Sequence, residues 1–197
     1  MAAAARKSAD PLESLLAEIR ACRICEKHLS PRPIIRASNA AKICIIAQAP
    51  GIRVHETGLS FNDPSGERLR EWMGVDRDTF YDESKIAIVG MGFCFPGYDA
   101  NGGDKPPRRE CAEAWHEKLF AVLPPFKLTL LVGSYAQARY IETGPNMTET
   151  VKAWRDYGPR VVPLPHPSWR NNAWLKKNPW FSQELLPVLR RRVRRLL

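Results

Sequence analysis

Four cysteines, arranged as two pairs, have a spacing that suggests metal chemistry. Cys22 and Cys25 form a Cys-x-x-Cys pair, and sixteen residues separate Cys94 from Cys111. Four such thiolates can hold a [4Fe–4S] cluster or a zinc ion, and the spacing does not choose between them. The alternative is that the thiols are unligated, because free cysteine commonly behaves as a small buried apolar residue. The fifth cysteine, Cys44, lies inside an apolar run, and we expect it in the core.

A late segment combines a histidine with aromatic and basic residues. His166, Pro167 and Ser168 follow an apolar run and lead into this segment. Its aromatic and basic residues are Trp169, Arg170, Trp174, Lys176, Lys177 and Trp180. Cations bind phosphates and flat rings stack on unstacked bases, so this composition favours a nucleic acid. The alternative is that the tryptophans pack in the core, which we expect for Trp180. The arginines within 190–195 can equally form a solvated tail.

An early segment, residues 48–63, offers further candidates. Residues 48–51 break the first apolar run, and His55 with Glu56 follow as either a proton-transfer pair or exposed loop residues. Phe61 precedes a predicted helix, and it either fills the core or offers a ring for stacking. The N-terminus of that helix would face this segment and favour an anion.

Four apolar runs predict the strands that position these candidates. These runs are rich in β-branched residues and end in Gly or Pro segments. They cover residues 42–47, 85–95 including the residues that leave the strand, 128–133 and 160–165. Chemistry gathers at the carboxyl ends of parallel strands, where the candidates lie.

Helical patterns alternate with the predicted strands. The first begins at Asp10-Pro11 and ends at the first cysteine pair, and the second runs from Ser65 to Gly74. The others cover 110–122, 134–142, 148–156 and about 180–196. The alternation predicts an α/β fold, a single three-layer α/β/α sandwich with a central four-stranded parallel sheet. We expect one domain over 10–197 after a disordered segment, 1–9.

Composition indicates a basic intracellular protein. Lys and Arg number 30 against 21 Asp and Glu, a net charge of +9, which favours a polyanionic partner over a merely basic surface. No apolar run approaches the ~20 residues of a membrane span, and the first ten residues lack a signal-peptide core. We expect no membrane partner and no disulfides.

Together these motifs resemble the uracil-DNA glycosylase superfamily, most closely its family 4 branch, from Cys22 to the last helix. The resemblance rests on four motifs in order. They are Cys22/Cys25, then Ala47-Gln48-Ala49-Pro50-Gly51 with Gly58 and Phe61, then Cys94/Cys111, and finally His166-Pro167-Ser168.

The resemblance implies a monomeric DNA glycosylase. Such an enzyme flips a deaminated base, uracil first, out of DNA and hydrolyses its N-glycosidic bond, leaving an abasic site as the first step of base excision repair. The four cysteines would hold a structural [4Fe–4S] cluster. Phe61 would stack on the base, and His166 would donate a hydrogen bond to the base oxygen that becomes anionic. The remaining implied contacts are Gln48, Ala49, Pro50, Gly51 and Gly90 for the base, and Ser168, Trp169, Arg170, Lys176 and Lys177 for DNA.

Several positions depart from the family pattern. Ala47 and Gln48 stand where family 4 has Gly and Glu, and Ala49 lacks the water-activating Asp of family 1. His55 replaces an acidic residue, and Gly90 replaces the asparagine that reads the uracil edge.

These departures keep alternatives open. They are a glycosylase for hypoxanthine or xanthine, a weak or inactive relative that binds damaged or abasic DNA, and a zinc-bearing α/β enzyme of another family. Candidates for handling water are His55, Glu56 and Asp63, with His166 and then His55 expected to be catalytic, together with Gln48.

Overall fold

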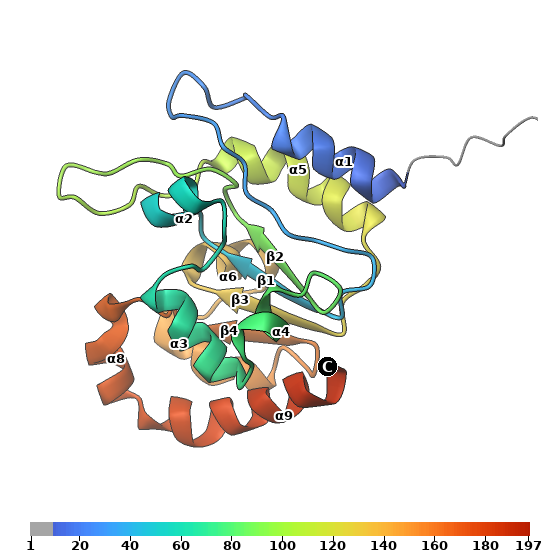
Figure 1. The fold of residues 1–197 in the computed structure, drawn as a ribbon. Helices are drawn as coiled ribbons and strands as arrows, with labels where there is room; N and C mark the ends of the chain where they lie inside the picture. The colour runs from blue at the N-terminus through green and yellow to red at the C-terminus, as the bar shows by residue number, and fades with distance from the viewer. Residues whose placement is uncertain (1–9) are drawn as a thin grey trace, which may run out of the picture.

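Four parallel strands form one sheet at the centre of the molecule, in the order β2-β1-β3-β4 (Figure 1). The computed structural model describes residues 10–197, so the expected disorder of residues 1–9 lies outside the described residues. The strands are β1 (Ile43–Ala47), β2 (Ile86–Gly90), β3 (Leu128–Val132) and β4 (Val161–Leu164). The predicted four-stranded parallel sheet is therefore confirmed.

Helices cover both faces of the sheet, which gives the predicted three layers (Figure 1). Alternate residues of β1 divide between the layers: Ile43 and Ile45 pack in one core cluster, Cys44 and Ile46 in the other. One cluster includes α3 (Pro64–Met73) and α9 (Leu186–Leu196), and the other includes α1 (Pro11–Arg20), α5 (Arg109–Val122) and α6 (Ser134–Tyr140). Cys44 is buried as expected.

The register of the sheet brings the strand ends together. Ala47 pairs with Gly90 at the ends of β1 and β2, and Val132 pairs with Leu164 at the ends of β3 and β4. The segments that leave these four residues therefore emerge at one edge, as expected for the carboxyl ends of parallel strands.

Some helix boundaries differ from the prediction. α1 ends at Arg20, so Cys22 and Cys25 lie in the turns that follow it. α3 begins at Pro64 rather than Ser65, because Asp63 accepts the Gly66 N–H at 2.8 Å and acts as the N-cap; Gly74 ends the helix as predicted. Phe181–Leu185, directly before α9, form a π-helix. Pro187, the second residue of α9, has no N–H to donate to a carbonyl of that preceding turn.

The remaining helices are short. They are α2 (Ile52–Thr57), α4 (Arg77–Tyr81), α7 (Met147–Lys152), α8 (Asn172–Lys177) and the 3-10 turns Ala153–Arg155 and Trp169–Asn171. Of the helices within residues 10–197, none has both the length and the apolar composition needed to cross a membrane.

Candidate functional site

A cleft of about 780 Å³ opens at the carboxyl edge of the sheet. Its walls come from four parts of the chain: the segment after β1, the segment leading into α3, the residues after β2, and the segment after β4. The cleft thus brings together the early and late segments that the sequence singled out.

Most of the predicted site residues line this cleft. They are Gln48, Ala49, Pro50, Gly51, Phe61, Gly90, His166, Ser168, Trp169 and Arg170. Lys176 and Lys177 do not line it; they are exposed on α8, which begins directly after the cleft-lining residues 166–171.

His55 lies outside the lining of the cleft. Its ring packs near Phe95, with 6.2 Å between the ring centroids, and its buried Nδ1 has no hydrogen-bond partner among residues 10–197. Glu56 is exposed and also lies outside the lining. Of the three expected water-handling residues, only Asp63 faces the cleft.

The exits of β1 and β2 are tied together, which explains why position 90 is a glycine. The Met91 N–H donates to the Ala47 carbonyl at 2.8 Å, and the Gly92 N–H donates to the Gln48 carbonyl at 2.9 Å. This turn brings the Gly92 carbonyl back over Gly90, so a Cβ at position 90 would lie 2.3 Å from that oxygen. An asparagine does not fit here, and the wall of the cleft is backbone at this point.

The side chain of Gln48 runs beside Gly133. A Cβ at Gly133 would lie 3.5 Å from both Cγ and Nε2 of Gln48. No hydrogen bond to another residue of the described chain engages this carboxamide, so it is free to bond to a molecule in the cleft.

Phe61 has an unusual backbone conformation, with φ of 56°. A side chain at Gly66 would collide with its carbonyl, and Arg70 donates to that carbonyl at 3.4 Å. Bulky residues rarely adopt this region, and such strain persists where the surroundings enforce it. The ring meets Phe80 edge to face, with centroids 6.1 Å apart, and Phe61 also lines the cleft. It therefore both packs against the core and borders the cleft, where a ring for stacking would lie.

His166 is held by its own loop. Its Nδ1 accepts the Ser168 N–H at 3.3 Å, and Asn171 Nδ2 donates to its carbonyl at 2.7 Å. Because Nδ1 accepts, this hydrogen bond assigns the proton of the neutral ring to Nε2. Burial lowers the pKa of His166; nearby Asp63 opposes this and Arg170 adds to it. The side chain is therefore a neutral donor near pH 7.

Arg68 fixes this loop against α3. Its guanidinium donates to the carbonyls of Pro167 and Ser168 at 3.2 and 3.1 Å. The contact joins the helix that follows Phe61 to the loop that carries His166. Sequence patterns gave no sign of it, because a surface-facing arginine on a helix has no distinguishing context.

The tryptophans of the late segment divide between two environments. Trp174 and Trp180 pack against the core cluster around α9, as expected for Trp180. Trp169 is 73% exposed at the cleft, and the Arg170 guanidinium lies 5.8 Å from its ring centroid. Among these three rings, Trp169 is the one available to a nucleic acid.

Three aspartates line the cleft: Asp63, Asp99 and Asp104. Partial burial raises the pKa of Asp104, with Arg170 opposing the shift. The sequence did not identify Asp99 or Asp104, because both lie in a loop rich in Gly, Pro and charge that has no periodic pattern.

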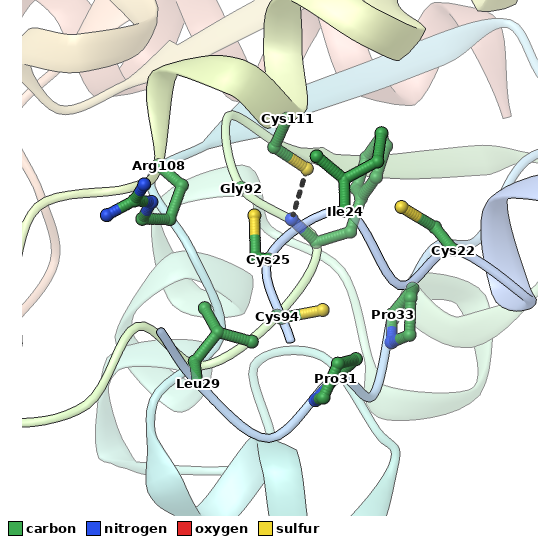
Figure 2. A pocket seen from close by; sticks show the side chains of 11 residues that line it. Cys22, Ile24, Cys25, Leu29, Pro31, Pro33, Gly92, Cys94, Arg108 and Cys111 are labelled. Atoms are coloured by element: carbon green, nitrogen blue, oxygen red, sulfur yellow. Dashed lines mark hydrogen bonds between the residues drawn. The ribbon is translucent and has the colours of Figure 1, made fainter. Parts of the chain in front are cut away.

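A second cavity is lined by all four paired cysteines, Cys22, Cys25, Cys94 and Cys111 (Figure 2). Two donors point at the sulfurs from outside: the Phe93 N–H lies 3.3 Å from Cys111 Sγ, and Trp115 Nε1 lies 3.4 Å from Cys22 Sγ. The two cysteine pairs, far apart in sequence, thus meet at one place beside the sheet.

The residue types of this donor set do not choose between two metal groups. A tetrahedral zinc site needs Zn–S bonds of about 2.3 Å, which holds the sulfurs about 3.8 Å apart. Within residues 10–197, no group of three or more Cys, His, Asp or Glu side chains is placed to hold a metal ion. Four thiolates are also the donor set of a [4Fe–4S] cluster, so the cysteines that line the cavity suit either group by residue type.

The wall of this cavity also suits a negatively charged group. Arg108 lines it, and its buried Nε has no hydrogen-bond partner in the described part of the chain. Burial raises the pKa of Cys25 and Cys94, and raises that of Cys111 to about 12. A bound metal would supply the positive charge that stabilises the thiolates.

A family model matches most of the chain. Residues 36–190 match the model of a family described as "Uracil DNA glycosylase superfamily". Among solved structures, the chain is similar to wild-type SMUG2 of Pedobacter heparinus, with 12% sequence identity and a TM-score of 0.38. That alignment covers 93% of this chain and 94% of the other.

Proposed function

The chain belongs to the uracil DNA glycosylase superfamily, and from this premise we propose that it is a DNA glycosylase that removes a deaminated base, uracil first. The observation that carries the proposal is His166, held in the cleft with its proton on Nε2. A donor preorganised for an oxygen that becomes anionic is worth ~3–4 kcal/mol of barrier.

The proposed reaction begins with base flipping. Extruding a base costs a few kcal/mol, which stacking and phosphate contacts offset. Phe61 supplies a ring in the cleft, Arg170 a cation and Trp169 an exposed ring at its edge. The His166 N–H then stabilises the departing base as the bond between the base nitrogen and C1′ breaks. The abasic product places the enzyme at the first step of base excision repair.

We propose that Gln48 reads the base edge in place of the missing asparagine. Its carboxamide offers one acceptor and a pair of N–H donors, and Gly90 leaves only backbone opposite. Uracil presents an N–H beside a carbonyl oxygen, and hypoxanthine and xanthine present the same pair. Release of these purines in addition to uracil is therefore part of the proposal.

The test is single-turnover base release from matched oligonucleotides that carry uracil, hypoxanthine or xanthine, single- or double-stranded. His166→Ala should lower the rate about 100- to 1000-fold, the equivalent of the donor's contribution. His55→Ala should lower it less, because His55 lies outside the cleft lining. Equal rates for His166→Ala and wild type would contradict the assignment of the site.

A second candidate function is binding of damaged or abasic DNA without catalysis. The observation that favours it is the first motif, where neither Gln48 nor Ala49 supplies a carboxylate. Tight, salt-sensitive binding of such DNA without release of any of the three bases would establish this alternative.

We further propose that the four-cysteine cavity holds a [4Fe–4S] cluster with a structural role. The cluster would tie the segment after α1 to the loop after β2 and to the start of α5, where the cysteines lie. Arg108 Nε and the indole of Trp115 would donate hydrogen bonds to its sulfurs.

This cofactor proposal is tested by iron and sulfide analysis and by visible absorption. Cys94→Ala should lose the broad absorption near 400 nm expected of an iron–sulfur cluster. Cys44→Ala is the matched control, since Cys44 is buried in the core away from this cavity, and it should keep the absorption. Zinc bound at one per chain without visible absorption would favour the alternative metal.

A further inference from the structure

We propose that Asp104 is a catalytic residue of the cleft, whose carboxylate binds and deprotonates the water that attacks the sugar. The inference rests on the proposed glycosylase function. It identifies the water-handling group that the first motif of this chain lacks.

Asp104 is the cleft aspartate whose carboxylate is uncommitted. Asp99 accepts the N–H groups of Asn101 and Gly103 at 2.8 and 2.9 Å, so it builds its own turn. Asp63 caps α3 through Gly66. No residue of the described chain donates a hydrogen bond to Asp104, so both its oxygens are free to accept from a water.

The backbone fixes where this carboxylate lies. Residues 97–105 form a hairpin: Asp99 donates its N–H to Gly103 at 2.7 Å, Lys105 donates to Gly97 at 2.9 Å, and Tyr98 pairs with Asp104. The two hydrogen bonds make up this antiparallel pairing, so backbone contacts on both sides of Asp104 fix its position.

The hairpin brings Asp104 to the first motif. A Cβ at Gly51 would lie 3.5 Å from Asp104 Oδ2, so the carboxylate abuts the end of the 48–51 segment. Ala49, in that segment, stands where family 1 has its water-activating aspartate. Asp104 therefore brings a carboxylate to the same wall of the cleft from another part of the chain.

The chemistry balances as a hydrolysis. The bond between C1′ and the base nitrogen breaks, and its electron pair leaves with the base, whose oxygen accepts the His166 N–H. The water oxygen forms a bond to C1′ while one of its protons passes to the Asp104 carboxylate. Solvent later takes that proton and protonates the released base. Before the attack, the carboxylate also stabilises the positive charge that develops on the sugar.

The test measures single-turnover base release by Asp104→Asn on the base that wild type releases fastest. General acid–base catalysis contributes at least about 100-fold, so we expect the rate to fall by that factor while affinity for substrate DNA changes little. Asp78→Asn is the matched control: it removes the same charge from an exposed position on α4, outside the cleft. Its rate should equal that of wild type.

A second measurement does not need catalysis. Oligonucleotides that carry a cationic pyrrolidine or a neutral tetrahydrofuran abasic analogue are compared for binding. Wild type should prefer the cation, and Asp104→Asn should lose most of that preference, whereas Asp78→Asn keeps it.

The outcomes separate the two proposals. If wild type releases a base and Asp104→Asn matches it in rate and in cation preference, the Asp104 inference fails and the glycosylase function stands. A loss seen in Asp63→Asn but not in Asp104→Asn also overturns the inference. If wild type releases no base, the proposed function fails, and the binding comparison still decides whether Asp104 faces the sugar.

Discussion

At the scale of single residues, the backbone of Phe61 shows that the site stores strain. An L-residue in the left-handed region costs about 1–2 kcal/mol, which glycine avoids. Phe61 stays there because Gly66 lets the backbone pass closely and because Arg70 binds its carbonyl. The ring is thereby presented both to Phe80 and to the cleft.

This strain predicts an inverted order of stability at position 61. Replacing glycine by alanine normally stabilises a chain by restricting its unfolded state. Here we expect Phe61→Gly to be about 1 kcal/mol more stable than Phe61→Ala in denaturant unfolding, because glycine adopts this φ without strain and alanine does not. Both variants should release base slowly, since both lack the ring.

The neighbouring position provides the control. Asn62 is not at positive φ, so Asn62→Ala should be at least as stable as Asn62→Gly. If the alanine variant were at least as stable as the glycine variant at position 61 as well, Phe61 would carry no strain.

The sequence predicted the residues that sit in contiguous motifs and missed those that depend on tertiary placement. His166, Phe61 and the 48–51 segment each adjoin a predicted strand or helix, so local pattern was enough to place them in one cleft. Arg68 and Asp104 enter the same cleft because of a helix-to-loop contact and a hairpin in a long loop. Neither feature leaves a periodic signal.

At the scale of secondary-structure elements, prediction followed the length of the element in part; α6 and α7 are short, yet both were predicted, within 134–142 and 148–156. The four strands and the helices α1, α3 and α5 were found because ten or more residues, or a run of β-branched ones, establish a pattern. α2, α4 and α8 have only five or six residues and gave no sequence signal. Their places are set by packing and by caps such as Asp76, which accepts the Thr79 N–H at 2.7 Å.

His116 links three elements behind the cleft. It lies on α5 and is 1% exposed; its Nε2 donates to the Gly90 carbonyl at 2.9 Å, and its Nδ1 accepts from Tyr140 at the end of α6. Burial lowers its pKa to about 4, against 6.5 for a free histidine. The neutral ring is thus part of the wall that supports the end of β2.

This pKa shift predicts acid sensitivity. The folded state holds His116 neutral while the unfolded state protonates it near pH 6.5, so its contribution is complete above that pH and is lost as pH falls toward 4. Between pH 7 and 5 the free energy of unfolding should fall by about 2 kcal/mol more in wild type than in His116→Gln. Denaturant unfolding at both pH values measures the difference, and parallel losses would show that His116 titrates normally.

At the scale of the whole molecule, the basic charge is spread over opposite ends of the fold. Lys176 and Lys177 are exposed on α8, directly after the cleft-lining residues 166–171. The end of α9, with exposed Arg194 and Arg195, lies at the other edge of the sheet: Lys42 Nζ, just before β1, donates to the Leu196 carbonyl at 2.9 Å (Figure 1). A net charge of +9 therefore does not imply one continuous binding face.

This separation predicts which charges contact DNA. Each phosphate neutralised adds about 0.9 to the slope of log affinity against log salt concentration for duplex DNA. Lys176→Ser with Lys177→Ser should lower that slope by about 1 to 2, because α8 begins directly after the cleft-lining residues 166–171. Arg194→Ser with Arg195→Ser removes the same net charge from the far edge and should leave the slope unchanged.

The measurement is titration of a tetrahydrofuran-containing duplex at several salt concentrations. Equal losses in the two double variants would show that DNA responds to net charge alone, whereas a loss confined to the arginine pair would place the DNA across α9 and away from the cleft.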